Sequence, residues 1–218
     1  MADKKRALVL IADGTEEMEA VITIDVLVRG GIEVTVASTN PSESTSENVK
    51  CSRGVRIVPD THLSVLPLPT LLDDFSKDKD NSGSIYYDVL VIPGGGPGAQ
   101  SMAASPLVHQ WIQSHFAKPG VLLASVCAGP TVLKAAGVAK GAQVTSHPSV
   151  REELKEYFEY RDDAKGEDGI VVKDEQYELL TSRGPGSTFQ FALKIVEELR
   201  GKEVMESVRA PMMFPCRA

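Results

Sequence analysis

Residues 6–37, RALVLIADGTEEMEAVITIDVLVRGGIEVTVA, hold the pattern that decides the fold. Arg6 to Ile11 is an apolar, β-branched run that predicts a buried strand, and Asp13-Gly14-Thr15 after it is a turn and helix-start signal. Apolar residues then recur at helical spacing as far as Gly30-Gly31, and Glu33 to Ala37 predicts a second strand. A strand, a helix and a strand in so short a stretch form a βαβ unit, which implies a parallel sheet.

The same alternation of strands and helices resumes at Tyr87. The expected elements are strands at Tyr87 to Ile92 and Val121 to Val126 with a helix at Leu107 to Phe116 between them, a helix at Pro130 to Ala136, a short strand at Val144-Thr145, a helix at Val150 to Phe158, a hairpin of Ile170 to Val172 with Tyr177 to Thr181, and an amphipathic helix that ends at Arg200. We therefore expect one doubly wound α/β domain over residues 1–218, with a mostly parallel sheet inside a three-layer sandwich.

Residues 39–85, between the two regular parts, are mixed in character. Val55 to Val58 is consistent with a short strand. The stretch DDFSKDKDNSG at 73–83 is polar and charged, and it predicts a mobile surface loop rather than a domain linker. We interpret it as an insertion at about 68–84.

Composition places the chain among ordinary globular proteins. It has 218 residues, 42% of them apolar, and a net charge of −7. An acidic balance without a basic cluster argues against nucleic acid as the main partner, and no run is long and apolar enough to cross a bilayer. Cys51, Cys127 and Cys216 are odd in number and too far apart for a zinc motif or a disulfide framework. We expect a cytoplasmic protein with reduced thiols, without metal, cofactor or membrane partner.

Cys127 stands where a predicted strand ends and the chain turns through Ala128-Gly129-Pro130. Ligands bind beyond the carboxyl ends of parallel strands, and a residue there lies at the N-terminus of the next helix. The helix dipole and unpaired N–H groups are expected to lower the thiol pKa, as at a nucleophile elbow. Backbone N–H groups of Gly95 and Ala128 would then face an oxyanion. The alternative is a buried cysteine that only fills space.

A nucleophile needs a proton carrier, and Glu19 is the preferred acid. It lies on one edge of the apolar stripe of the first helix, so we expect a partly buried carboxyl group with a raised pKa. Glu16 and Glu17 are interpreted as ordinary acids at a helix N-terminus.

Of the four histidines, only His147 follows a predicted strand and would reach the same rim. His62 lies in an irregular stretch. His109 and His115 fall in a predicted helix, and we expect both to face solvent.

Six motifs occur in order along the chain: GTEEMEAV, CSRG, VIPGGGPGA, VCAGP, TSHPSV and TSRGPGST. Together they resemble the ThiJ/PfpI superfamily from about Lys5 to Pro211, and the set is far more specific than any single motif. The resemblance implies a flavodoxin-like α/β sandwich and a homodimer.

The resemblance also implies roles for single residues. Cys127 would be the nucleophile, Glu19 its carboxylate partner and His147 an auxiliary group near the pocket. The implied substrate-binding positions are Gly95 and Ala128 as oxyanion donors, Arg53 and Arg29 as pocket arginines across the dimer interface, and Gly184 and Pro185 as part of the pocket wall.

This chain departs from the family pattern at several positions. The loop around 73–83 is longer, and the tail at 212–216 differs. Val58 stands where close relatives often carry a second redox-active cysteine. Cys51 matches a family cysteine, and we expect it near the dimer interface.

The implied function is a glutathione-independent glyoxalase and deglycase that acts on methylglyoxal, glyoxal and early glycation adducts. The alternative is an oxidative-stress sensor and redox-dependent chaperone, in which Cys127 oxidises to sulfenic and then sulfinic acid. Both use the same thiol.

Other cysteine enzymes fit the sequence less well. Protease-like members of the superfamily place histidine directly after the cysteine, where this chain has Ala128. Glutamine amidotransferases need an acid two residues after a downstream histidine, but the residue two positions after His147 is Ser149.

Dinucleotide binding also fits the sequence less well. The pattern Gly94-x-Gly96-x-x-Ala99 resembles a dinucleotide fingerprint, yet it is not in the first βα unit and the next strand brings no ribose-binding acid.

Overall fold

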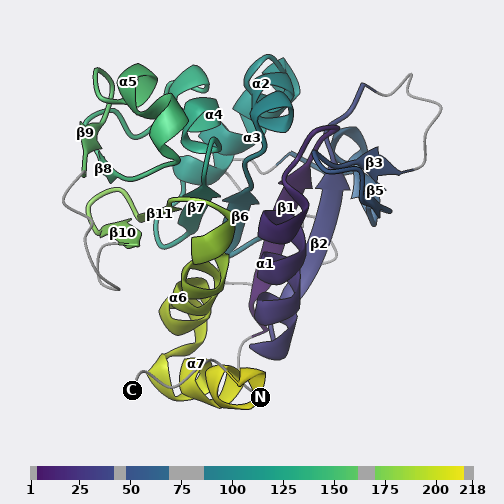
Figure 1. Cartoon of the computed structure of the whole chain (residues 1–218), viewed down its shortest axis with the longest axis vertical. Helices are drawn as coiled ribbons and strands as arrows, with labels where there is room; N and C mark the ends of the chain where they lie inside the picture. The colour runs from purple at the N-terminus through teal and green to yellow at the C-terminus, as the bar shows by residue number, and fades with distance from the viewer. Residues whose placement is uncertain (1–3, 42–47, 69–85, 162–169, 214–218) are drawn as a thin grey trace.

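The structure is a computed structural model that describes residues 4–41, 48–68, 86–161 and 170–213. Within these ranges the central sheet has seven strands in the order β10-β11-β7-β6-β1-β2-β5 (Figure 1). From residue 69 onward the expected insertion lies outside the described residues, and so does Cys216. The strands of the sheet are β1 (Arg6–Ile11), β2 (Glu33–Ser38), β5 (Thr61–His62), β6 (Val89–Ile92), β7 (Leu122–Val126), β10 (Val171–Asp174) and β11 (Leu179–Ser182).

The topology of this sheet confirms the predicted fold class. Among the strands above, neighbours are parallel except β10 and β11, which form the expected hairpin. Counted along the chain, β2-β1-β6-β7-β11 follow the order 2-1-3-4-5 of a flavodoxin-like sheet. The order reverses between β1 and β6, so the carboxyl ends of these strands border the crevice where such folds bind ligands.

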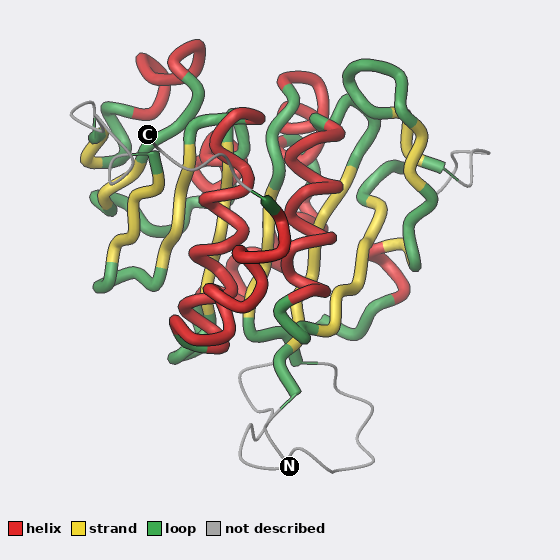
Figure 2. Tube along the Cα trace, turned by 60° about the horizontal axis from the view of Figure 1, so that its bottom comes forward, coloured by secondary structure: helices red, strands yellow, loops and turns green. Residues whose placement is uncertain are grey.

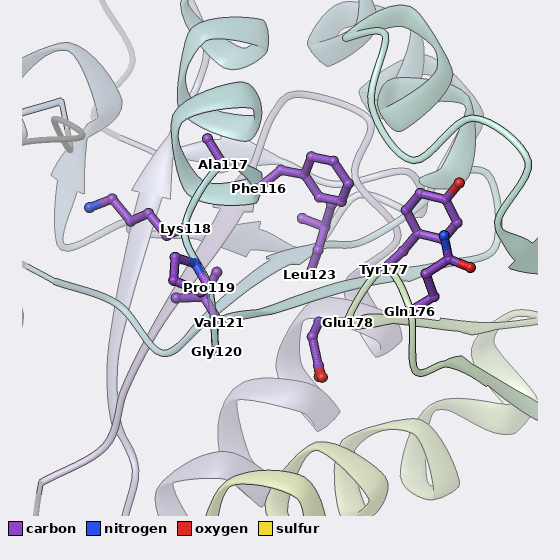
Figure 3. Close-up of a pocket in the computed structure, with 10 residues that line it drawn as sticks. All are labelled: Phe116, Ala117, Lys118, Pro119, Gly120, Val121, Leu123, Gln176, Tyr177 and Glu178. Atoms are coloured by element: carbon purple, nitrogen blue, oxygen red, sulfur yellow. The ribbon is translucent and has the colours of Figure 1, made fainter.

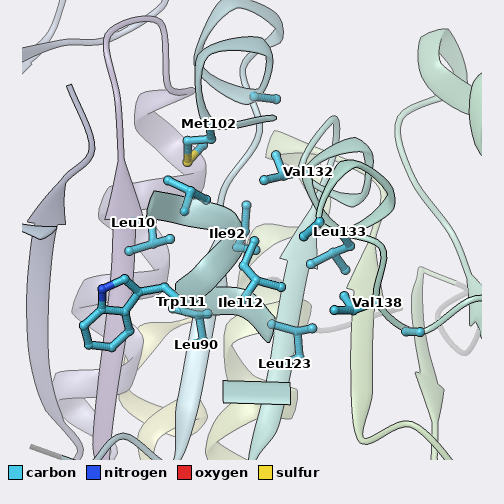
Figure 4. Close-up of a cluster of buried hydrophobic side chains, with 14 of the residues drawn as sticks. Leu10, Leu90, Ile92, Met102, Trp111, Ile112, Leu123, Val132, Leu133 and Val138 are labelled. Atoms are coloured by element: carbon cyan, nitrogen blue, oxygen red, sulfur yellow. The ribbon is translucent and has the colours of Figure 1, made fainter. Parts of the chain in front are cut away.

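Both faces of the sheet are covered by helices, because successive β1 residues point to opposite sides and all but Arg6 are buried. Leu8 and Leu10 pack with α2 (Gly96–Ala103), α3 (Pro106–Phe116) and α4 (Pro130–Ala135), in the cluster around Trp111 that Figure 4 shows. Ala7 and Val9 pack with α1 (Glu17–Arg29), α6 (Thr188–Arg200) and α7 (Lys202–Arg209). Figure 2 shows the strands between these helices, which gives the three expected layers.

Short elements complete the described chain. They are the antiparallel pair β3 (Val49–Lys50) and β4 (Arg56–Ile57), the parallel pair β8 (Gln143–Val144) and β9 (Glu159–Tyr160), helix α5 (Arg151–Leu154), and 3-10 turns at Leu63–Val65, Pro148–Val150, Pro185–Ser187 and Ala210–Met212. The helix expected at Val150 to Phe158 is therefore shorter than predicted, since residues 155–158 form a turn that leads into β9.

Two helices were not expected from the pattern. Helix α2 begins in the glycine-rich stretch after β6, where glycine disfavours a helix. It forms because Pro97 suits a first turn and because Gly98 packs against Thr15, where a Cβ atom would lie 2.6 Å from the Thr15 nitrogen. Helix α7 follows Gly201 and packs on α6.

The expectation that His109 and His115 face solvent is wrong. His115 is 3% exposed, and its Nε2 lies 3.0 Å from the Leu122 carbonyl oxygen. His109 is half-buried, with Nε2 2.8 Å from the Ala103 carbonyl oxygen. Both rings find backbone partners on neighbouring elements, at the end of α2 and at the start of β7, so a polar ring on this helix does not need water.

Candidate active site

Cys127 lies at the carboxyl end of β7 in a strained backbone conformation. Its φ angle is +62°, in the left-handed region that side chains other than glycine rarely adopt. Its N–H donates to the Ser182 carbonyl at 3.0 Å, and its carbonyl accepts from the His147 N–H at 3.0 Å. Three segments thus fix the turn, which confirms the predicted elbow geometry.

Glycines let the neighbouring strands approach this elbow. A Cβ atom at Gly94 would lie 2.6 Å from the Cys127 Cβ atom and 2.9 Å from Glu19 Oε2. A Cβ atom at Gly129 would lie 2.5 Å from the Ile92 carbonyl oxygen. Such contacts are closer than packed atoms tolerate, so only glycine permits the thiol and the carboxylate to meet here.

Glu19 projects from the first turn of α1 and is fully buried. Its Oε2 accepts a hydrogen bond of 2.7 Å from the Gly94 N–H, while Oε1 has no hydrogen-bond partner among the described residues. Glu16 caps the helix, because its carboxylate accepts from the Glu19 N–H at 2.9 Å. Burial raises the pKa of the Glu19 carboxyl to about 7, against the Gly94 and Cys127 hydrogen bonds, and the Glu16 charge adds to the rise.

The expected fall in the Cys127 pKa is wrong. Burial raises the pKa of this half-buried thiol to about 12, and the adjacent Glu19 charge adds to the effect. Hydrogen bonds from the Gly95 and Ala128 N–H groups favour the thiolate but do not outweigh these causes. The helix that follows, α4, is only six residues long, so its dipole is small.

The two groups are therefore best described as a coupled pair. Two acids that interact strongly lose their protons in steps that belong to the pair and not to either residue. The first loss, with a pKa of about 7, leaves one negative charge on the pair, and it lies on the Glu19 carboxylate because burial holds the proton on the thiol. The thiolate with a protonated carboxyl and the thiol with a carboxylate carry the same charge. The Gly95 and Ala128 N–H groups favour the thiolate form.

Gly184 closes one side of this pair. A Cβ atom there would lie 4.0 Å from Cys127 Sγ, 4.0 Å from Glu19 Oε1 and 3.7 Å from His147 Cδ2. The structure thus brings these four residues together. Pro185 follows at the start of the 3-10 turn Pro185–Ser187, and it is half-buried.

The ring of His147 is exposed and oriented by Ser149. Its Nδ1 accepts from the Ser149 N–H at 3.2 Å and lies 2.8 Å from the Ser149 hydroxyl oxygen. A neutral ring whose Nδ1 accepts carries its proton on Nε2. In this form His147 can donate a hydrogen bond from Nε2.

The two arginines lie on the surface. Arg53 is exposed, and its backbone is bound by Glu17. Arg29 pairs with Asp25 at 2.6 Å, and it lies ten residues after Glu19, about 15 Å further along α1. Within one chain the structure does not bring Arg29 to Cys127, so its expected role depends on a partner subunit.

Glu17 does more than the sequence interpretation assigned to it. Its carboxylate is buried and accepts hydrogen bonds from Ser52, Arg53 and Val55. Neither spacing nor residue type marks this role, because the partners lie 35 to 38 positions further along the chain. The only available signal was the acid-rich start of the helix, which suits an N-terminal turn equally well.

A cavity of about 280 Å³ lies near the amino ends of β7 and β11, at the other end of the strands from Cys127 (Figure 3). The residues that line it include Phe116, Leu123, Tyr177 and Glu178. Leu123 is near the amino end of β7, whereas Cys127 is at its carboxyl end. The cavity is therefore not part of the site around the thiol.

Two kinds of feature are absent from the described residues. No cluster of three or more His, Cys, Asp and Glu side chains is placed to hold a metal ion. None of the helices described above has the length and apolar character to span a membrane.

Comparisons with known proteins find similar proteins over nearly the whole chain. Residues 5–198 match the sequence model of the DJ-1/PfpI family. The chain is 45% identical to protein dj-1beta of Drosophila melanogaster over 94% of both chains. It is 39% identical to the glutathione-independent glyoxalase DJR-1.2 of Caenorhabditis elegans, over 97% of this chain and 98% of that one. The crystal structure of Drosophila melanogaster DJ-1beta superposes with a TM-score of 0.79 at 42% identity, and covers 98% of this chain and 100% of that one.

Proposed function

Because this chain belongs to the DJ-1/PfpI family, we propose that it is a glutathione-independent glyoxalase and protein deglycase that acts on methylglyoxal and glyoxal. The name of the nematode relative supports an enzymatic role. The observation that carries the proposal is the contact between a thiol on a strained turn and a buried carboxyl whose pKa is raised to about 7. Such a pair supplies a nucleophile and a proton carrier at neutral pH.

In the proposed reaction the Cys127 thiolate adds to the aldehyde carbon of methylglyoxal and forms a hemithioacetal. Glu19 removes the hydrogen from that carbon as a proton and, through an enediol, returns it to the neighbouring carbon. The aldehyde carbon is oxidised and the ketone carbon is reduced, so no external oxidant is needed. Water then hydrolyses the resulting thioester, which releases lactate and regenerates the thiol.

Three further contacts support this sequence of steps. The Gly95 and Ala128 N–H groups point at the sulfur and would stabilise oxygen anions formed next to it. Nε2–H of His147, which lies beside Gly184, would donate to the second oxygen of the dicarbonyl. Gly184 and Pro185 would form the wall against which the small substrate lies.

The test is conversion of methylglyoxal by purified protein without glutathione. The wild-type protein is expected to release lactate, and Cys127→Ser and Glu19→Ala are each expected to lose this activity. Because Ser is nearly isosteric with Cys, a folded Cys127→Ser protein with wild-type turnover would refute the assignment.

A sensor of oxidative stress is the second candidate function. Glu19 Oε1 is buried without a partner beside the half-buried thiol. When protonated, Glu19 would donate a hydrogen bond to a sulfinate and so stop oxidation at that stage. Mass spectrometry after mild peroxide treatment tests this idea, and selective dioxidation of Cys127 is the expected result.

We also propose that the protein is a homodimer, which would bring Arg29 to the partner's site. The outer face of α1 exposes three apolar side chains, Met18 (49%), Val21 (48%) and Val28 (56%). A row of exposed apolar side chains on one helix is typical of an interaction surface. Sedimentation at micromolar concentration tests it, because a monomer would remove Arg29 from the site.

A further inference from the structure

The Glu17 carboxylate is the centre of a compact set of hydrogen bonds. Oε1 accepts from the Arg53 N–H at 2.8 Å and from the Val55 N–H at 3.4 Å, and Oε2 accepts from the Ser52 hydroxyl at 2.8 Å and from the Arg53 N–H at 3.0 Å. The residue is only 7% exposed. Burial opposes its ionisation, but these hydrogen bonds lower its pKa below the ordinary value. Glu17 therefore holds the loop as an anion.

The loop that Glu17 holds is also bound to the turn before α1. The Ser52 N–H donates to the Thr15 carbonyl at 2.8 Å, and the Gly14 N–H donates to the Lys50 carbonyl at 2.8 Å. The same turn touches the oxyanion segment, because the Glu16 N–H donates to the Gly94 carbonyl at 3.0 Å. The loop at 51–55 is thus connected to the reacting centre through one short stretch of backbone.

Glu17 and Glu19 use the two sides of one helical turn. Residues two apart in a helix point in nearly opposite directions. Glu19 reaches inward to Gly94 and Cys127, and Glu17 reaches outward to the loop. The first turn of α1 is therefore a common base for the reacting pair and for the loop that carries Arg53.

We propose that Glu17 is a positioning residue of the active site. It holds the Ser52–Val55 loop so that Arg53 faces the oxygens of a dicarbonyl bound at Cys127 of its own chain, and not at the site across the dimer interface as the resemblance implies. This inference rests on the proposed glyoxalase function. Glu17 itself does not touch the substrate. Its charge strengthens the hydrogen bonds from the loop, because an ionised acceptor binds N–H groups about twice as strongly as a neutral one.

The first experiment measures the loop without any substrate. Amide hydrogen exchange is followed residue by residue in the wild-type protein and in Glu17→Gln, which keeps the side-chain volume but removes the charge. The Arg53 and Val55 amides are expected to exchange about tenfold faster or more in the variant, as expected for loss of a charge-assisted hydrogen bond. The Gly94 amide, which donates to Glu19, is expected to keep its rate. Unchanged rates at Arg53 and Val55 overturn the proposal.

A matched control is Glu203→Gln, since Glu203 is an exposed glutamate in the first turn of α7. It is expected to change none of these amide rates. Glu17→Asp tests whether the length of the side chain matters, because it keeps the charge but is one methylene shorter. The loop amides of this variant are expected to exchange faster than in the wild type. Exchange of the loop amides at the wild-type rate in Glu17→Asp contradicts the need for this side chain.

The second experiment measures the position of Arg53 by charge-selective alkylation. Mass spectrometry gives the rates at which Cys127 reacts with anionic iodoacetate and neutral iodoacetamide. A cation facing the thiol raises the ratio of the first rate to the second. Glu17→Gln and Arg53→Ala are each expected to lower this ratio, and the double variant is expected to lower it no further than Arg53→Ala alone. An unchanged ratio in Glu17→Gln overturns the positioning role.

Turnover completes the test and separates the two claims. With methylglyoxal, Glu17→Gln is expected to raise KM severalfold with a smaller effect on kcat, because the Cys127 and Glu19 pair stays intact. The alkylation ratio needs no turnover. Absence of methylglyoxal conversion by the wild-type protein therefore refutes the proposed function, whereas an unchanged ratio refutes the role of Glu17 alone. A fall in kcat with unchanged KM contradicts positioning of the substrate.

Discussion

Glu19 and Cys127 lie against the same glycine, because a Cβ atom at Gly94 would be 2.6 Å from the Cys127 Cβ atom and 2.9 Å from Glu19 Oε2. Within the part of the chain that the structure describes, Glu16 and Cys127 are the only titratable side chains that shift the pKa of this carboxyl. The chemistry of the site therefore depends on the one charge of this pair, and the following predictions test it.

The first prediction concerns the pH dependence of thiol reactivity. In the wild-type protein the pair loses its first proton with a pKa of about 7, so alkylation of Cys127 by iodoacetamide is expected to rise with pH through that value. In Glu19→Gln this step is expected to disappear, because the carboxyl that titrates is gone. A profile with the same midpoint in both proteins would show that another group controls the thiol.

Turnover is expected to depend on Glu19 more steeply than alkylation does. Removal of a general acid–base group typically costs about 10²- to 10⁴-fold in rate. The kcat of Glu19→Gln with methylglyoxal is therefore expected to be lower by about a hundredfold or more, while iodoacetamide still alkylates Cys127. Comparable losses in both measurements would mean that the variant has disturbed the elbow instead of the proton transfer.

The raised pKa of Glu19 also predicts how stability depends on pH. The folded value of about 7 exceeds the ordinary value of 4.5, so the folded state binds more protons between these limits. The stabilisation from the protonated carboxyl is complete below pH 4.5 and is lost as the pH rises through about 7. Relative to Glu19→Gln, the wild-type free energy of unfolding is expected to fall by about 3 kcal/mol from pH 4 to pH 8. Urea unfolding at both pH values measures it, and an equal difference at the two pH values contradicts it.

Gly94→Ala is expected to disrupt the site by steric contact alone. The new Cβ atom would force apart the thiol and the carboxyl, and we expect a loss of about 1–3 kcal/mol in stability together with the loss of turnover. Gly96→Ala is the matched control, since nothing lies within 4 Å of its Cβ position and alanine favours the first turn of α2. Thermal unfolding of both variants is the measurement, and equal effects would exclude the contact as the cause.

The dimer proposal predicts a different response from two surface valines. Val21→Glu places a charge on the apolar face of α1 and is expected to produce monomers at micromolar concentration in a sedimentation experiment. Val65 is more exposed, at 70%, but lies away from α1, so Val65→Glu is expected to leave the assembly unchanged. Dissociation by both variants, or by neither, argues against an interface on α1.

Much of the fold was predictable because its signals are local. The β1-α1-β2 unit follows from apolar spacing within residues 6–37, and the observed limits differ from the expected ones by a residue or so. The position of Cys127 at a strand end followed from its place between an apolar run and Ala128-Gly129-Pro130. Helix α2 was missed because glycine propensity argues against it, and its reason is a contact with Thr15 from a distant part of the chain.

The sequence by itself determined most of the elements, the mostly parallel character of the sheet, and the candidate pair Cys127 and Glu19, because hydrophobic periodicity and turn chemistry act over a few neighbouring residues. Only the tertiary structure decided how that pair ionises, why Glu17 differs from Glu16, and that His115 is buried. These properties depend on desolvation and on distances between atoms far apart in the chain, such as Glu19 and Gly94, which are 75 positions apart. The packed sheet and its helices set those distances.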